Sequence, residues 1–132
     1  MNPAKPELPV SKAAFYTGWV LTILCVALLS LSAAMKFAKP PMVVEGMQQS
    51  GFDESLLLGI GILEVVCTLI YLIPRTSVLG AILLTGYLGG AIVTHLRMGE
   101  PYWIPIVLGI VIWLAIYLRE PRLRVLTPLR MF

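Results

Sequence analysis

The feature that most constrains this chain is its division into four long apolar runs separated by polar connections. The runs cover residues 13–37, 54–73, 77–96 and 102–118. A helix needs about 20 apolar residues to cross the hydrocarbon core of a bilayer, and the fourth run is close to the lower limit of about 17. Because lipid offers no partner to a free backbone N–H or C=O, such runs must be helical. We therefore predict an all-α fold, a bundle of four transmembrane helices.

The composition argues against a water-soluble globule and against a nucleic-acid-binding protein. Only 13% of the 132 residues are charged, whereas soluble domains carry about 25%. The net charge of +3 is small, and the positive residues lie mostly in the ends and turns, where they set membrane topology. We predict a cytoplasmic N-terminal tail at 1–12, a four-helix domain at 13–118 that sits in the lipid bilayer, and a basic cytoplasmic C-terminal tail at 119–132.

The connections between the runs predict which helices are neighbours. Residues 74–76 and 98–101 form tight turns, so the helices that each turn joins must be antiparallel and adjacent. Pro74 ends the second helix, and either Thr76 or Ser77 is expected to cap the third.

The long first connection and the positive charges predict the orientation. Residues 43–49 favour a short amphipathic helix that lies on the membrane surface. Most lysines and arginines fall on the side of the two chain ends, which makes that side cytoplasmic and the chain a multi-pass protein of a cell inner membrane. These residues are Lys5, Lys12, Arg75, Arg119, Arg122, Arg124 and Arg130.

Glu64 is the most informative single residue, because it lies near the middle of an apolar run. An ionisable group at that depth costs about 2.5–3.5 kcal/mol on insertion scales, so it usually faces the bundle interior and has a partner. Lys36 and His95, each near the end of another run, are the candidate partners. Two interpretations stay open: Glu64 serves a ligand, proton or cofactor, or it is a structural hydrogen-bond acceptor. Lys36 and His95 are likewise either site residues or interfacial ones.

Helical spacing extends this candidate site. We predict a narrow polar cleft that opens outward, with Glu64 at its floor and with Lys36 and His95 near its mouth. Three aromatic residues on the second, third and fourth runs are expected to line the apolar part of the cleft. They are Tyr71, Tyr87 and Trp113.

The remaining chemical groups have weaker patterns. Cys25 and Cys67 fall near mid-membrane, where they are either small buried apolar residues or a redox pair. Gly86 and Gly90 form a G-x-x-x-G pair that allows close helix packing within the chain or in a dimer. Soft methionine ligands near His95 would suit Cu(I), but no zinc-type spacing occurs and we predict no metal site. The methionines are Met35, Met42, Met47 and Met98.

Four segments carry a resemblance to the DoxX-like family of small four-helix membrane proteins. They are residues 32–37 (SAAMKF), 61–65 (GILEV), 73–76 (IPRT) and 91–97 (AIVTHLR). The resemblance covers about residues 13–130, and the family's recurring polar positions fall on Lys36, Glu64 and His95. It implies a redox setting, since the founding name is that of a thiosulfate–quinone oxidoreductase subunit. Other members look like membrane partners of soluble redox or thiol-stress enzymes, and a distant relative looks like an assembly chaperone.

We therefore expect a redox-associated subunit of a bacterial inner membrane, an accessory protein more than a stand-alone enzyme. It would bind a quinone or another small apolar ligand, with Glu64 accepting a proton or hydrogen bond, His95 donating or relaying, and Lys36 balancing charge. Its protein partner would be a redox enzyme or a second copy of the chain. The alternative is a non-catalytic assembly factor or anchor that uses the Gly86/Gly90 face or the basic tail. A small transporter is a third possibility, although no span shows the broken helix typical of transporters.

Overall fold

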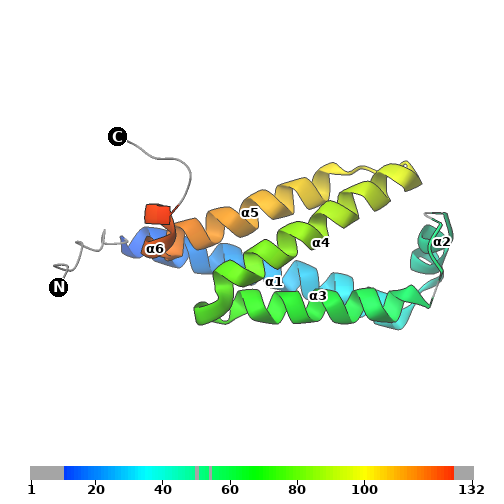
Figure 1. Ribbon diagram of the computed structural model, residues 1–132, viewed down its shortest axis with the longest axis horizontal. Coiled ribbons are helices and arrows are strands. Elements are labelled where there is room, and N and C mark those ends of the chain that lie inside the picture. The colour runs from blue at the N-terminus through cyan, green and yellow to red at the C-terminus, as the bar shows by residue number, and fades with distance from the viewer. Residues whose placement is uncertain (1–10, 50, 54, 127–132) are drawn as a thin grey trace.

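The computed structural model describes residues 11–49, 51–53 and 55–126. These residues form helices and no strands, so the prediction of an all-α fold is confirmed. The helices, shown in Figure 1, are α1 (Lys12–Ala38), α2 (Pro41–Gln49), α3 (Leu56–Leu72), α4 (Ser77–Met98), α5 (Trp103–Arg119) and α6 (Pro121–Leu126), with a 3₁₀ turn η1 (Pro74–Thr76) before α4. Each predicted run begins and ends within two residues of the corresponding helix. Residues 1–10 and 127–132 of the two predicted tails lie outside the described residues.

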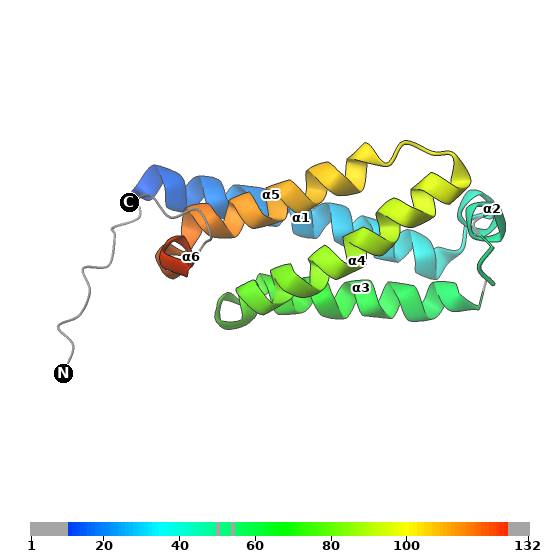
Figure 2. The same ribbon diagram turned by 45° about the horizontal axis from the view of Figure 1, so that its top comes forward.

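The four long helices pack side by side as a bundle. Helices α1 and α4 each contact both α3 and α5. Figures 1 and 2 show that α4 starts beside α3 and leans across to end beside α5. The start of α1, the turn η1 and α6 lie at one end of the bundle, the α6 end. Helix α2 and the α4–α5 connection lie at the opposite end, the α2 end.

Polar side chains lie inside this bundle and large apolar side chains cover its surface. Thr22, Glu64, Thr68, Ser77 and Arg119 are all buried. Examples of exposed apolar side chains come from every long helix: Leu24, Leu28, Leu31, Ile62, Leu69, Ile82, Val93, Ile104 and Ile110. A water-soluble protein rarely exposes so continuous an apolar surface. The exterior is therefore suited to hydrocarbon and the interior to polar contacts.

The lengths of two of the four long helices also fit an apolar exterior that faces lipid. Helix α1 and the segment Pro74–Met98 are each long and apolar enough to cross a membrane. Helices α3 and α5 are apolar but have 17 residues each.

Local sequence explains where α1 begins and ends. The Ser11 hydroxyl accepts a hydrogen bond from the Ala14 N–H at 3.1 Å, which satisfies one free donor of the first turn. At the other end Lys39 adopts a left-handed conformation with φ of 51° and donates its N–H to Met35. The prolines at 40 and 41 then prevent the helix from continuing. The short helix predicted over 43–49 is present as α2.

The prediction that Thr76 or Ser77 caps α4 is wrong. The Thr76 hydroxyl donates to the carbonyl of Ile70 at 2.7 Å, and the Ser77 hydroxyl donates to that of Tyr71 at 2.8 Å. Neither side chain caps the start of α4. The turn η1 brings both hydroxyls back to the end of α3, where helix carbonyls have no backbone partner.

Glycines decide how closely the helices approach. A Cβ added at Gly80 would collide with the backbone of Tyr71, so α3 and α4 touch at this point. A Cβ at Gly18 would lie 2.7 Å from the carbonyl oxygen of Ala115, which marks a similar contact between α1 and α5. By contrast, nothing lies within 4 Å of a Cβ placed at Gly86 or Gly90. The G-x-x-x-G pair is therefore not used for packing within the described part of the chain.

Candidate functional site

Three side chains surround the one carboxylate that is buried among the described residues, and we name these four residues together the polar cluster. The cluster consists of Ser32 and Lys36 on α1, Glu64 on α3 and Tyr87 on α4. Glu64 is 1% exposed. The Lys36 ammonium donates to Glu64 Oε1 at 3.5 Å, and the Ser32 hydroxyl donates to Glu64 Oε2 at 3.2 Å. The pairing of Lys36 with Glu64 that the sequence suggested is thus present.

Helix geometry explains how a lysine near the end of α1 reaches the middle of α3. Ser32 and Lys36 are four residues apart, so both lie on one face of α1. A helical side chain leans toward the N-terminus of its helix, which carries the Lys36 ammonium back over Ser32. There the ammonium donates to the Ser32 hydroxyl at 2.8 Å. Ser32 therefore accepts from Lys36 and donates to Glu64, which orients both charged groups.

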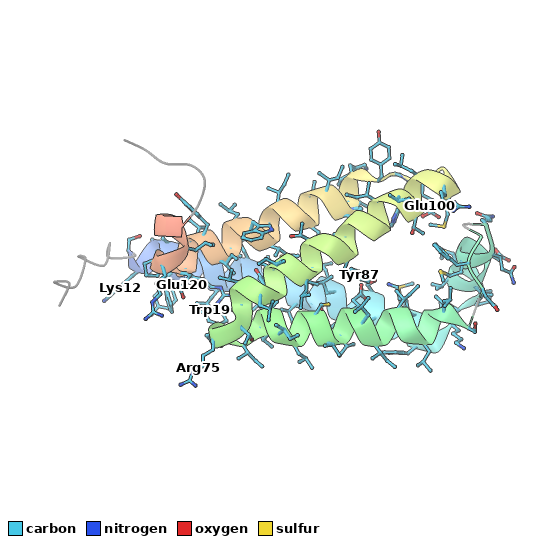
Figure 3. The ribbon with its side chains drawn as sticks, in the orientation of Figure 1. Lys12, Trp19, Arg75, Tyr87, Glu100 and Glu120 are labelled. Carbon is cyan, nitrogen blue, oxygen red and sulfur yellow. The ribbon has the colours of Figure 1, made fainter. Side chains whose placement is uncertain are left out.

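Tyr87 closes the polar cluster from the side of α4. The Lys36 ammonium lies 5.9 Å from the centre of the Tyr87 ring, close enough for a cation–π contact. The Tyr87 hydroxyl also interacts with the Glu64 carboxylate. Figure 3 shows Tyr87 projecting from α4 into the space beside α3. The carboxylate is consequently surrounded by an ammonium, an alcohol and a phenol from two neighbouring helices.

Lys36 is the more exposed member of the ion pair. The Lys36 side chain is 20% exposed, whereas that of Glu64 is 2% exposed. The carboxylate is therefore almost fully enclosed by protein, whereas the sequence suggested that it lies on the floor of an open cleft.

His95 does not join the polar cluster. Its Nδ1 lies 2.7 Å from the carbonyl oxygen of Ala91, and its Nε2 lies 3.9 Å from Glu100 Oε2. His95 is eight residues beyond Tyr87, or about 12 Å along the helix. Because α4 also leans toward α5 at this end, the imidazole lies at the rim beside Glu100, which Figure 3 places at the α2 end.

Tyr71 and Trp113, predicted to line the apolar part of the site, instead join helices elsewhere. Tyr71 is fully buried, and its hydroxyl donates to the backbone carbonyl of Ile112 on α5 at 2.9 Å. The Trp113 ring N–H donates to the Thr85 hydroxyl on α4 at 2.7 Å. Both side chains therefore hold α5 against its neighbours, and their hydrogen bonds leave the polar cluster untouched.

Replacing Tyr71 with phenylalanine should lower the free energy of unfolding by about 0.5–1.5 kcal/mol, the net value of one hydrogen bond. Tyr102, the residue directly before α5, provides a matched control, because its side chain is exposed. Denaturant unfolding of the detergent-solubilised variants measures the free energy of unfolding of Y71F and of the control Y102F. Equal stability of Y71F and Y102F would show that the contact with Ile112 contributes nothing.

An apolar groove runs along the outer surface between α1 and α3. Its polar lining includes Thr68, whose hydroxyl donates to the backbone carbonyl of Glu64 one turn earlier on α3 at 2.7 Å. The groove is otherwise almost entirely apolar. Its lining residues are Val26, Leu29, Ser30, Ala33, Ala34, Phe37, Val65, Thr68, Leu69 and Leu72.

The cysteines belong to the apolar core and not to this site. Cys25 and Cys67 are both buried free thiols that pack in the same core cluster. Within residues 11–49, 51–53 and 55–126, no three His, Cys, Asp or Glu side chains come together to hold a metal ion.

Two residues of the polar sites were not among the predicted site residues. For Ser32, the signal is its spacing of four residues from Lys36, which places both on one stripe of the first helix. Arg119, assigned to the basic tail, is the last residue of α5 and is only 7% exposed. Its signal was the helical period, since Ile112 and Ile116 lie on the same buried face.

Together, the fold and the site define a small helical protein with an apolar exterior and a charged pair in its interior. The model of the DoxX-like family matches residues 20–117, and the chain belongs to this family. The predicted resemblance is thereby confirmed, and family membership indicates a membrane protein. No curated protein and no solved structure matches the chain.

Proposed function

We propose that this protein is a redox-associated membrane subunit that binds the headgroup of a quinone-like ligand at the polar cluster. The observation that carries the proposal is the burial of Glu64 together with two hydrogen-bond donors, Lys36 and Tyr87. Ionisable residues inside membrane helices are costly and usually mark a ligand or proton site.

In this proposal all four long helices cross a bacterial inner membrane, with both chain ends in the cytoplasm. Exposed apolar side chains on α1, α3, α4 and α5 support four spans. The exposed Lys12, Arg75 and Arg122 lie toward the α6 end, as expected for the cytoplasmic side. Helices α3 and α5 are about 25 Å long at 1.5 Å per residue, somewhat shorter than the hydrocarbon core. Local thinning of the bilayer would accommodate them.

The chemistry of the polar cluster matches a quinone headgroup. Quinone carbonyl oxygens are hydrogen-bond acceptors, and the Lys36 ammonium and the Tyr87 hydroxyl are donors that can reach a shared acceptor. Reduction to the quinol takes up two electrons and two protons. A partner redox enzyme would exchange the two electrons, Glu64 would exchange one proton with the ligand, and water would exchange the second.

The apolar groove between α1 and α3 supports the same ligand class. A quinone carries a long hydrocarbon chain, and the groove is lined by α1 and α3, the two helices that carry Ser32 and Glu64. Phe37 lines the groove and would also meet a Cβ at Gly61, at 2.8 Å, so its ring lies directly against α3 one turn from Glu64. The chain of the ligand would lie in the groove while its headgroup occupies the cluster.

Titration with a short-chain benzoquinone tests this proposal. Wild-type protein in detergent should bind it, and E64Q should bind about tenfold or more weakly, because the Glu64 carboxylate orients the donor Lys36 through a hydrogen bond between charged groups, which contributes about 1.5–3 kcal/mol. The matched control is E45Q, since Glu45 is exposed on α2. Equal affinity of wild type and E64Q, or equal loss in both variants, would contradict the proposal.

A second candidate function, a non-catalytic assembly factor or anchor, rests on a different surface. The open space at Gly86 and Gly90 leaves one face of α4 free to meet another transmembrane helix. An anchor of this kind would bind no quinone, either as wild type or as E64Q. The same titration therefore separates the two functions.

A further inference from the structure

A second charged group is buried inside the bundle, at the α6 end and away from the polar cluster. Arg119 ends α5 and is 7% exposed. Its Nε is buried and has no hydrogen-bond partner. Neither the Lys36–Glu64 ion pair nor the contact between His95 and Glu100 includes Arg119. The interior therefore holds a cation whose charge no described carboxylate balances.

Three helices hold the guanidinium in a fixed orientation. Its central carbon lies 4.3 Å from the centre of the Trp19 ring on α1 and 5.7 Å from that of Tyr71 on α3. One terminal nitrogen, Nη2, donates to the Ser77 hydroxyl on α4 at 3.1 Å. The contact with the Trp19 ring and the hydrogen bond to Ser77 together restrict the position of the guanidinium.

These contacts compensate the charge only in part. The Ser77 hydroxyl is neutral, and it already donates to carbonyls at the end of α3. The C-termini of α3 and α5 contribute partial negative charge, which falls off within about one turn. Arginine cannot lose its proton to escape burial. An unpaired charge in such a place is strongly destabilising, so an anion that completes the pair would stabilise the bundle.

The surroundings of Arg119 attract anions. Figure 3 places Lys12, Trp19 and Arg75 at the same end of the bundle, and Arg122 follows on α6. Glu120 is the acidic side chain that the described residues contribute here, and it accepts a hydrogen bond from the Arg122 N–H at 3.2 Å. The end thus carries an excess of positive charge at the depth where lipid headgroups lie if the bundle spans a bilayer.

We propose that Arg119 is a binding site for a phosphate group, supplied by an anionic phospholipid whose headgroup enters at the rim where α6 begins. A phosphate presents two oxygens to the planar guanidinium, a geometry that arginine is well suited to bind. The surrounding lysine and arginines select a headgroup with net negative charge over a zwitterionic one. Inorganic phosphate carries the same oxygens, and the experiment distinguishes the two sources.

The experiment titrates delipidated full-length protein in neutral detergent with phosphatidylglycerol, phosphatidylcholine or inorganic phosphate, and counts bound molecules by mass spectrometry. Wild type should bind one phosphatidylglycerol, at a concentration about tenfold lower than R119Q requires. The exposed Arg122 supplies the matched control, and R122Q should stay within about threefold of wild type, as surface charges contribute little. R119K keeps the charge but lacks the planar guanidinium, so its affinity for phosphatidylglycerol should fall between those of wild type and R119Q. It replaces R119Q as the test variant if R119Q does not fold.

Three results would overturn the proposal. Wild type could bind phosphatidylglycerol no better than phosphatidylcholine, a comparison that requires no variant. R119Q and R122Q could lose affinity equally, which would show diffuse attraction instead of a site. Inorganic phosphate could bind wild type as tightly as the lipid does, which would overturn the lipid as the source of the phosphate.

Discussion

Replacing Lys36 with methionine should lower the free energy of unfolding by about 3–5 kcal/mol, the cost of leaving a buried charge without its partner. Glu64 is 1% exposed, and the Lys36 ammonium donates both to it and to Ser32. Methionine keeps a long apolar side chain, so the loss comes from the missing charge more than from a cavity. Denaturant unfolding in detergent micelles measures the change.

Two further variants identify the cause. K36M/E64Q removes both charges, and its stability should return to within about 1–2 kcal/mol of wild type, since a buried pair contributes little net stability. K39M should be nearly neutral, because Lys39 is exposed and forms no ion pair among the described residues. If the double variant is as unstable as K36M, the ammonium stabilises the bundle by some means other than Glu64.

Replacing Gly80 with alanine should destabilise the protein by about 2–4 kcal/mol, at or above the usual range for overpacking. The new Cβ would meet the backbone of Tyr71, which cannot rotate away as a flexible side chain could. Helices α3 and α4 would have to separate next to the turn η1 that joins them. The hydroxyl bonds of Thr76 and Ser77 to the end of α3 would then be strained as well.

The same substitution at Gly86 is the control. Gly86 is on the same helix, and nothing lies within 4 Å of its added Cβ. G86A should therefore be neutral or more stable by about 0.5–1 kcal/mol, the helix preference of alanine over glycine. Equal effects of G80A and G86A would show that helix propensity, and not the α3–α4 contact, sets the outcome.

The interior of the bundle is divided along its length. Glu64 and Tyr71 are seven residues apart on α3, or about 10.5 Å. The polar cluster lies around the first of them, and Arg119 contacts the second. Buried apolar residues of the core, including Leu29 and Leu84, pack in the same interior. The buried carboxylate and the buried guanidinium therefore occupy different levels of the bundle.

Sequence alone predicts the helices well, because the apolar runs and the turn residues act locally. It also predicts the partnership of Lys36 with Glu64, since a buried carboxylate requires a partner and few cations are available. His95 was an equally reasonable partner by spacing. His95 lies about 12 Å beyond Tyr87 along α4, where that helix has leaned toward α5, and this arrangement of helices cannot be read from any single one.

The choice of hydrogen-bond partners is the second limit of sequence reasoning. Tyr71 has a polar end that could serve a ligand, yet its hydroxyl is taken by the carbonyl of Ile112. Ser77 was expected to cap α4 but serves α3 and Arg119. Such choices depend on which groups lie nearby in space, because each buried donor must find an acceptor.

The most direct test of the proposed ligand site compares what wild-type protein and E64Q retain when each is extracted gently from its own membrane. Native mass spectrometry of the intact protein identifies any bound small molecule. The proposed function predicts a quinone on the wild-type protein and its loss from E64Q, with E45Q unchanged. A wild-type protein that carries no small molecule, or one that carries only the same phospholipids as E64Q and no quinone, would contradict a ligand site at Glu64.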